Sequence, residues 1–306
     1  MKKYLIIGIT ILMMVTPLAA ASPNAMSAVK TDVKQVRMSQ EDFTHTVMVE
    51  YGTMTTCPYC VIASSQLYSI YNSGDLDFYY VSLVYDKGNA NVRDRLTELG
   101  VTSVPDVYFD GGYKRRQGAQ QDEQPYRNAI TQCGERTVPN INVDVNVEWK
   151  GGGTLKITVN VLNNEPTDYN GHLRDYVVEK ESRWDDNGGN PYHFGVLDIP
   201  IDRSLSTTPS ASISKAGQSS PIGGTTYTFV KTWRGALYGF GDITQNNILV
   251  IASVFDPDSG YAVQTAAAEP TSSGGSSVTL SSQMQQLLPS IKTLCNQMLL
   301  KVLSNH

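Results

Sequence analysis

The sequence predicts a multidomain protein in which an α/β domain is followed by an all-β sandwich and an amphipathic C-terminal helix. Three observations lead to this prediction. Between residues 33 and 137, apolar runs typical of buried strands alternate with segments of helical spacing. Between residues 139 and 269 the pattern changes to short strands separated by turn residues. After a linker over 270–282, apolar residues recur at helical spacing over 283–306.

The N-terminus has the pattern of an export signal. Lys2 and Lys3 precede an apolar stretch over 4–15, and small residues follow at 19–22. This order predicts a signal peptide over residues 1–22 that is removed by cleavage. An uncleaved membrane anchor is the alternative, since the apolar stretch is just long enough to span a bilayer. In both cases we expect an extracytoplasmic protein, secreted or at the cell surface, in a compartment where disulfides persist.

Composition narrows the function further. The 306 residues carry a formal net charge of −5 and the sequence pI is about 5.4, which argues against nucleic-acid binding. The four cysteines are Cys57, Cys60, Cys133 and Cys295. A structural zinc site needs four ligands. The sequence has only one closely spaced cysteine pair, and its histidines are scattered, so it does not offer such a set of ligands. The sequence therefore implies no metal and no cofactor.

The α/β region alternates strands and helices in a regular order. Asn89 is a suitable N-cap and Gly100 a suitable C-terminal residue for the second helix. An Asp-Gly pair at 110–111 predicts a turn between the last two strands. The expected elements are a strand at 46–51, a helix at 60–71, a strand at 77–84, a helix at 89–99, a strand that begins at Pro105 and ends in the turn at 110–111, a strand at 113–117, and a helix at 122–133.

A C-x-x-C motif lies between the first strand and the first helix, as Cys57-Pro58-Tyr59-Cys60. At a helix N-terminus the macrodipole and the free backbone N–H groups favour a thiolate. Cys57 is the more exposed of the pair in this arrangement, so we expect it to be the nucleophile that forms a mixed disulfide. Cys60 lies one turn into the helix and would resolve that intermediate.

Together with Val104-Pro105, this motif resembles the dithiol site of the thioredoxin superfamily. The resemblance implies that the α/β domain is thioredoxin-like and that Pro105 is a cis-proline facing the dithiol. It also implies that Pro58, Tyr59 and Val104 contact the substrate chain.

The resemblance assigns a further role to Glu50. Glu50 corresponds to the buried carboxylate that handles the proton of the resolving thiol, although its spacing to the first cysteine is one residue longer than in the family. The alternative is an exposed glutamate at a strand end.

The residue pattern of the second half predicts an antiparallel β-domain. Apolar and polar residues alternate strictly over 141–149 and again over 155–161, with three glycines between them. Seven short strands with turn signals predict an immunoglobulin-like sandwich over 139–269. The other expected strands are at 172–178, 192–199, 225–233, 247–255 and 261–266. Acidic loops at 185–190 and 256–260 have the residues of turns; calcium is the alternative, without the EF-hand spacing.

Several stretches of this half resemble the Omp28-related secreted proteins. These stretches are 171–179, 191–193, 227–233 and 248–256. In that family a thioredoxin-like half precedes a β half, so the resemblance implies the same two-domain order here. It implies no particular activity.

The C-terminal segment is expected to be an amphipathic helix on a flexible tether. Its apolar residues include Met284, Leu288, Ile291 and Val302. Polar residues interrupt the run, so the helix should not cross a bilayer. It would dock on the chain's own domains, on a partner or second copy, or on a membrane surface. Cys295 lies near its apolar face, and the sequence leaves open whether it pairs with Cys133.

Two functions fit these features. The first is an exported thiol–disulfide oxidoreductase or isomerase that acts on cysteines of other extracytoplasmic proteins. Such an enzyme would need a membrane or secreted redox partner. The second is a non-catalytic binding or structural module in which Cys57–Cys60 is a structural disulfide. The direction of electron flow is open at this point.

Overall fold

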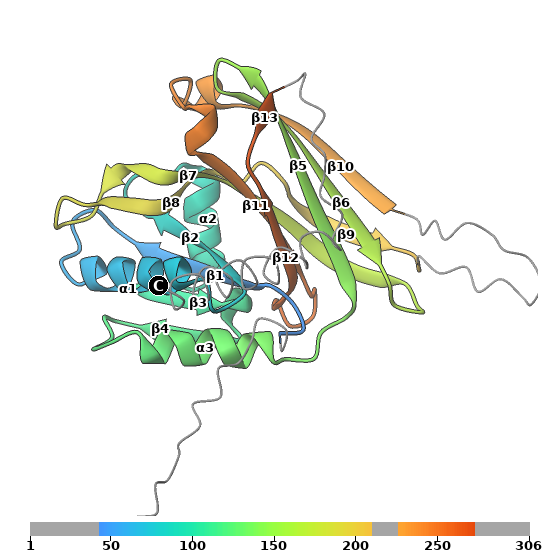
Figure 1. Ribbon diagram of the computed structural model, residues 1–306, viewed down its shortest axis with the longest axis horizontal. Coiled ribbons are helices and arrows are strands. Elements are labelled where there is room, and N and C mark those ends of the chain that lie inside the picture. The colour runs from blue at the N-terminus through green and yellow to red at the C-terminus, as the bar shows by residue number, and fades with distance from the viewer. Residues whose placement is uncertain (1–42, 210–225, 273–306) are drawn as a thin grey trace, which may run out of the picture. The chain divides into compact units, whose positions relative to one another are not determined.

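The structure is a computed structural model that describes residues 43–209 and 226–272. In these ranges the chain forms three α-helices and thirteen strands arranged in two sheets (Figure 1). The expected signal peptide, the C-terminal helix and Cys295 lie outside the described residues. No helix within the described ranges is long and apolar enough to cross a membrane.

The first half contains all three α-helices. Helix α2 is capped by the side chain of Asn89, which accepts a hydrogen bond from the backbone N–H of Val92. Helix α1 ends at Gly74, which has φ +64°, a conformation that glycine adopts without strain. The elements are β1 (Val47–Thr53), α1 (Cys60–Ser73), β2 (Phe78–Val84), α2 (Ala90–Glu98), β3 (Asp106–Phe109), β4 (Lys114–Gln117) and α3 (Gln124–Gly134).

The second half is made of strands and short 3₁₀ turns in the described residues. The turn that matters below is η3 (Gly235–Tyr238). The strands are β5 (Ile141–Gly151), β6 (Thr154–Asn163), β7 (Tyr169–Asp185), β8 (Pro191–Asp198), β9 (Asp202–Thr207), β10 (Thr226–Arg234), β11 (Ile248–Phe255), β12 (Ala262–Ala268) and β13 (Thr271–Ser272). The two residues of β13 fall at the start of the expected linker and pair in parallel with β5.

The expected fold class, an α/β thioredoxin-like domain followed by a separate immunoglobulin-like sandwich, is wrong. The described chain is mostly β, and strands of both halves share one nine-stranded sheet in the order β12-β11-β7-β8-β2-β1-β3-β4, with β9 paired to β7 (Figure 1). The second sheet has four strands in the order β10-β6-β5-β13. The halves join where β8 lies parallel to β2, at the pair Ser82 and Gly195.

The burial of β2 gives the physical reason for this continuity. Six of its seven residues are buried, so it is a central strand that needs a hydrogen-bonded neighbour on each side. Strand β1 provides one neighbour and β8 provides the other. The apolar run at 77–84 predicts a buried strand, but it does not say which distant segment pairs with its second edge.

Strands β7 and β11 lie between two hydrophobic cores. Successive side chains on a strand point to opposite faces, and on β7 Tyr176 and Val178 pack into the core around α1 and β1. Val177 packs into the other core, against the four-stranded sheet. All eight residues of β11 are buried for the same reason. The core of the first half is therefore completed by side chains of the second.

Candidate functional site

A disulfide joins Cys57 and Cys60 at the start of α1. The backbone N–H of Cys60 lies 3.2 Å from the Sγ of Cys57 and points at it. The residue at the N-cap position, Tyr59, makes no side-chain cap of its own, so this sulfur takes the place of a capping oxygen. When the disulfide is reduced, the same N–H and the helix dipole would stabilise a thiolate on Cys57.

The sulfur of Cys57 opens toward a groove of about 580 Å³. Cys57 is 5% exposed and Cys60 is fully buried, so Cys57 is the more accessible of the pair. The groove is lined by apolar Met54, Val101 and Val104, by Pro58, Tyr59 and Tyr85, and by the hydroxyl residues Thr56, Thr102 and Ser103.

Val104 brings backbone to the dithiol from the segment before β3. Its carbonyl oxygen lies 3.7 Å from the Sγ of Cys57. The Val104–Pro105 peptide bond is cis, as the resemblance implies. Pro105 itself is buried and does not line the groove. The structure thus brings Cys57, Cys60, Pro58, Tyr59 and Val104 together, with Pro105 next to them in the chain.

Two buried tyrosines, which the sequence interpretation missed, hold the backbone on both sides of the disulfide. The hydroxyl of Tyr51 on β1 donates to the carbonyl of Cys60 over 2.8 Å. The hydroxyl of Tyr192 on β8 donates to the carbonyl of Met54 over 3.0 Å, and that carbonyl also accepts the N–H of Cys57 over 3.1 Å. The side chain of Thr53 donates to Tyr192, which fixes the direction of its hydroxyl. A residue of the second half therefore positions the backbone before Cys57.

The loop before Cys57 is also tied to the turn after β2. Asp86 accepts hydrogen bonds from the backbone N–H and the hydroxyl of Thr55. Partial burial would raise the pKa of Asp86, but the bonds from Thr55 outweigh it and lower that pKa. This carboxylate ties the turn that contains Tyr85 to the dithiol loop.

The surroundings of Glu50 differ from those expected for a proton carrier of the dithiol. Adjacent strand residues point to opposite faces, so Glu50 points away from the face where Tyr51 meets α1. It is fully buried and accepts two hydrogen bonds of 2.7 Å from Arg95 and one of 2.6 Å from Tyr176. Burial alone would raise the pKa of Glu50, but the charge and hydrogen bonds of Arg95, with Arg174 and Tyr176, lower it. The extra residue of spacing noted in the sequence is the signal that could have moved the expectation to Tyr51.

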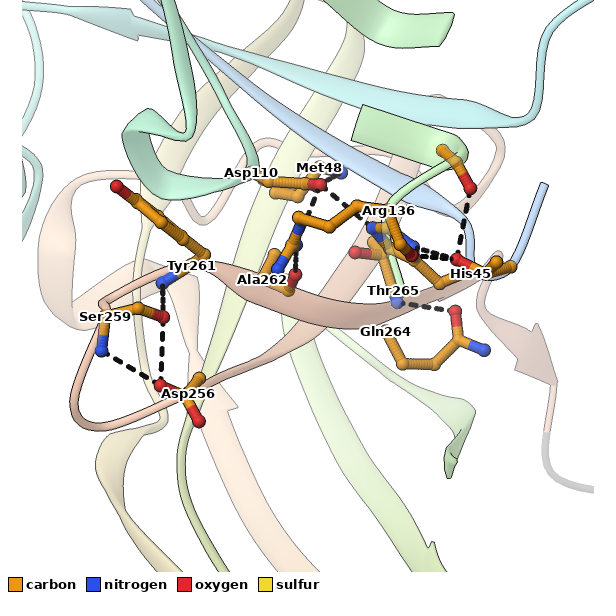
Figure 2. A network of polar contacts seen from close by, with 12 residues as sticks. His45, Met48, Asp110, Arg136, Asp256, Ser259, Tyr261, Ala262, Gln264 and Thr265 are labelled. Atoms are coloured by element: carbon orange, nitrogen blue, oxygen red, sulfur yellow. Dashed lines mark hydrogen bonds and ion pairs between the residues drawn. The ribbon is translucent and has the colours of Figure 1, made fainter. Parts of the chain in front are cut away.

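A second buried polar cluster lies around Asp110, and Figure 2 shows it from close by. Asp110 accepts from the backbone N–H of Met48 over 3.0 Å and from Arg136 over 3.0 Å, and it lies 2.9 Å from Nε2 of His45. Arg136 also donates to the carbonyl of Ala262 on β12. These contacts join the first strand to β12.

Cys133 is free and buried beside this cluster. Burial, with the nearby Asp110 carboxylate, raises the pKa of the Cys133 thiol well above its ordinary value. It is a protonated core thiol at neutral pH. Its expected alternative partner, Cys295, lies outside the described residues.

The acidic loops of the second half act as turns. Asp186 accepts from the backbone N–H groups of Gly188 and Asn190, and Asp256 accepts from those of Asp258 and Ser259. Within residues 43–209 and 226–272, no group of three or more His, Cys, Asp or Glu side chains is placed to hold a metal ion.

The fold and site define a mostly β protein that carries a disulfide-bonded C-x-x-C at a helix N-terminus. No protein-family model matches the chain, and no curated protein matches it. It is similar to a solved structural-genomics target from Agrobacterium tumefaciens, with 13% identity and a TM-score of 0.44 over 74% of this chain and 95% of that chain. It is also similar to a domain of the outer membrane lipoprotein Omp28 from Porphyromonas gingivalis, with 13% identity and a TM-score of 0.22 over 45% of this chain and 94% of that chain. A calcium-binding mutant of Bacteroides uniformis beta-glucuronidase 2 matches at 12% identity and a TM-score of 0.26, over 43% of this chain but 14% of that enzyme.

Proposed function

We propose that this chain is an extracytoplasmic thiol–disulfide oxidoreductase or isomerase that acts on cysteines of other proteins. The observation that carries the proposal is the placement of Cys57. Its sulfur is bonded to Cys60 at a helix N-terminus, receives a backbone N–H, and opens into a groove beside the Val104 carbonyl. The local sequence resemblance of C-P-Y-C and Val104-Pro105 to the thioredoxin superfamily supports the same chemistry.

The reaction would proceed by two exchanges. In the reducing direction, the Cys57 thiolate attacks one sulfur of a substrate disulfide, and the other substrate sulfur leaves and takes up a proton. The Cys60 thiolate then attacks the Cys57 sulfur and releases the second substrate thiol. The substrate gains two electrons, and the protein is left with the Cys57–Cys60 disulfide. A membrane or secreted dithiol protein would reduce it again, and the oxidising direction is the reverse.

The test is turnover by the purified mature protein. We expect it to accelerate insulin reduction by dithiothreitol, and we expect Cys57→Ser to abolish the acceleration. Cys133→Ala is the matched control, because it removes a thiol that lies away from the groove. Cys60→Ser should accumulate mixed disulfides with client proteins, whose sequencing would name the substrates. Equal rates for wild type and Cys57→Ser would refute the proposal.

The burial of both cysteines favours a second candidate function, a non-catalytic module stapled by a structural disulfide. The reduction potential of the pair separates the two. A value below about −300 mV is typical of a structural bond, whereas about −120 to −270 mV is typical of redox catalysts.

The extracytoplasmic location rests on the N-terminal sequence. We expect the mature protein to begin after residue 22, and N-terminal sequencing of protein from the envelope or medium would check this. A chain that starts at Met1 in the cytoplasmic fraction would contradict it.

A further inference from the structure

The groove beside Cys57 is lined without any charged side chain among the described residues. The nearest acidic group in the turn, Asp86, has its carboxylate bound to Thr55. A charged ligand would therefore lose hydration in the groove without gaining a counter-charge.

Two exposed tyrosines belong to this groove and come from different elements. Tyr59 lies between the two cysteines and is 65% exposed, and Tyr85 follows β2 and is 54% exposed. Aromatic rings give a large apolar contact area together with a polar hydroxyl. Exposed aromatic side chains that meet at a groove are typical of a binding surface. Tyr59 lies at the N-cap position of α1, and the turn that carries Tyr85 is tied to the dithiol loop through Asp86 and Thr55.

We propose that this groove selects substrates whose reacting cysteine is flanked by uncharged apolar or aromatic residues, and that Tyr59 and Tyr85 determine this specificity. The inference rests on the proposed function. The reacting substrate cysteine would lie in this groove, because Cys57 lines it together with the two tyrosines. Flanking apolar side chains would pack on the rings and on Met54 and Val101, while flanking acids and bases would both be disfavoured.

Turnover on a peptide panel tests the selection. The substrates are mixed disulfides of glutathione with short peptides in which the cysteine is flanked by Phe and Leu, by Asp, or by Lys. For the reduced wild-type protein we expect kcat/KM to be about tenfold higher for the apolar peptide than for either charged one. Tyr85→Ser should reduce this ratio toward one by slowing the apolar peptide alone.

Tyr238→Ser is the matched control, because Tyr238 is 51% exposed in η3 and lies outside the groove. In this variant the ratio of kcat/KM for the apolar peptide to kcat/KM for the charged peptides should equal that of wild type. Turnover with no preference, or a preference that survives both Tyr85→Ser and Tyr59→Ser, would overturn the inference and leave the proposed function in place.

A binding measurement separates this inference from the proposed function. The oxidised full chain is titrated with fluorescent versions of the same peptides that carry Ser in place of Cys. Tighter binding of the apolar peptide that is lost in Tyr85→Ser supports the groove assignment even where no turnover occurs, and in that case the proposed function fails alone. Equal binding of all peptides overturns the inference. A synthetic peptide of residues 283–302 that displaces the fluorescent apolar peptide more strongly than the unlabelled apolar peptide does would reassign the groove to the chain's own tail.

Discussion

The ion pair between Glu50 and Arg95 gives the sharpest test of how the site is built, through the substitution Glu50→Gln. Glutamine keeps the shape of the side chain and one oxygen acceptor, but it places an amide donor against the Arg95 guanidinium. The variant therefore loses one of the two 2.7 Å charge-assisted bonds and leaves Arg95 with the exposed Glu98 as its remaining acidic partner. Such bonds contribute about 1.5–3 kcal/mol each, and breaking a buried pair costs about 3–5 kcal/mol. Because Glu98 still provides a negative charge next to Arg95, we expect Glu50→Gln to lower the free energy of unfolding by about 3 kcal/mol.

The assay is urea unfolding at pH 7, followed by circular dichroism. Glu98→Gln is the matched control, because it removes an exposed carboxylate that bonds both Arg95 and Arg174. Arg95 keeps Glu50 and Arg174 keeps Asp202, so this variant should cost about 1 kcal/mol or less. The lowered pKa of Glu50 also sets a pH dependence. Its stabilisation is fully present above the unfolded pKa of about 4.3 and is lost as the pH falls through the lower folded value. The difference in the free energy of unfolding between wild type and Glu50→Gln should therefore become smaller only below about pH 4.

The same variant distinguishes a structural role from a proton-carrying one. If Glu50 only supports β1, the pH profile of insulin reduction per folded molecule should be unchanged in Glu50→Gln. Equal stability of the Glu50→Gln and Glu98→Gln variants would refute the energetic reasoning. A shifted pH profile at unchanged stability would refute the structural assignment.

Three further predictions concern groups that the two halves share or bury. Tyr192→Phe removes the hydrogen bond to the Met54 carbonyl. We expect the free energy of unfolding in urea to fall by about 1 kcal/mol and reduced Cys57 to be alkylated more slowly. Tyr126→Phe is the control, because the Tyr126 hydroxyl has no partner among the described residues, and it should change neither quantity. Asp110→Ala removes the buried acceptor of the Met48 N–H, of His45 and of Arg136, although Arg136 keeps the Ala262 carbonyl. It should cost about 3–5 kcal/mol in the same assay, and a loss below about 1 kcal/mol would contradict this. Because burial raises the pKa of Cys133, its stabilisation is complete below the unfolded pKa of about 8.5 and is lost as the pH rises above it. Cys133→Ala should flatten that alkaline slope in urea unfolding, and iodoacetamide at pH 8 should label Cys133 only after denaturation.

The parts of the site that the sequence predicts are those set by local pattern. Cys57, Pro58, Tyr59 and Cys60 are consecutive, and helix α1 begins at Cys60. The apolar runs at 46–51 and 77–84 predict buried strands, and β1 and β2 occupy these places. Periodicity and helix-terminus rules depend on neighbours within a few residues, so a single sequence contains the information they need.

The parts that were missed depend on register and on distant pairing. Glu50 and Tyr51 are adjacent, and a shift of one residue exchanges the faces on which they lie. Both side chains fit the expected strand, so only the pairing of β1 with its neighbours decides that Tyr51 meets Cys60. Tyr192 reaches the Met54 carbonyl from 138 residues away, and no local pattern marks such a contact.

The second half supplies part of the structure around the dithiol. Strand β8 completes the sheet next to β2, and its Tyr192 fixes the backbone before Cys57. Strand β7 contributes Tyr176, which closes the hydrogen bonds of the buried Glu50 on the other face of β1. The strand that leads into the dithiol loop is thus held on both faces by residues of the second half. Preorganisation of a reactive group requires that its supporting side chains be locked by packing and hydrogen bonds. In this chain the first half supplies the cysteines, and β7 and β8 of the second half supply much of that support.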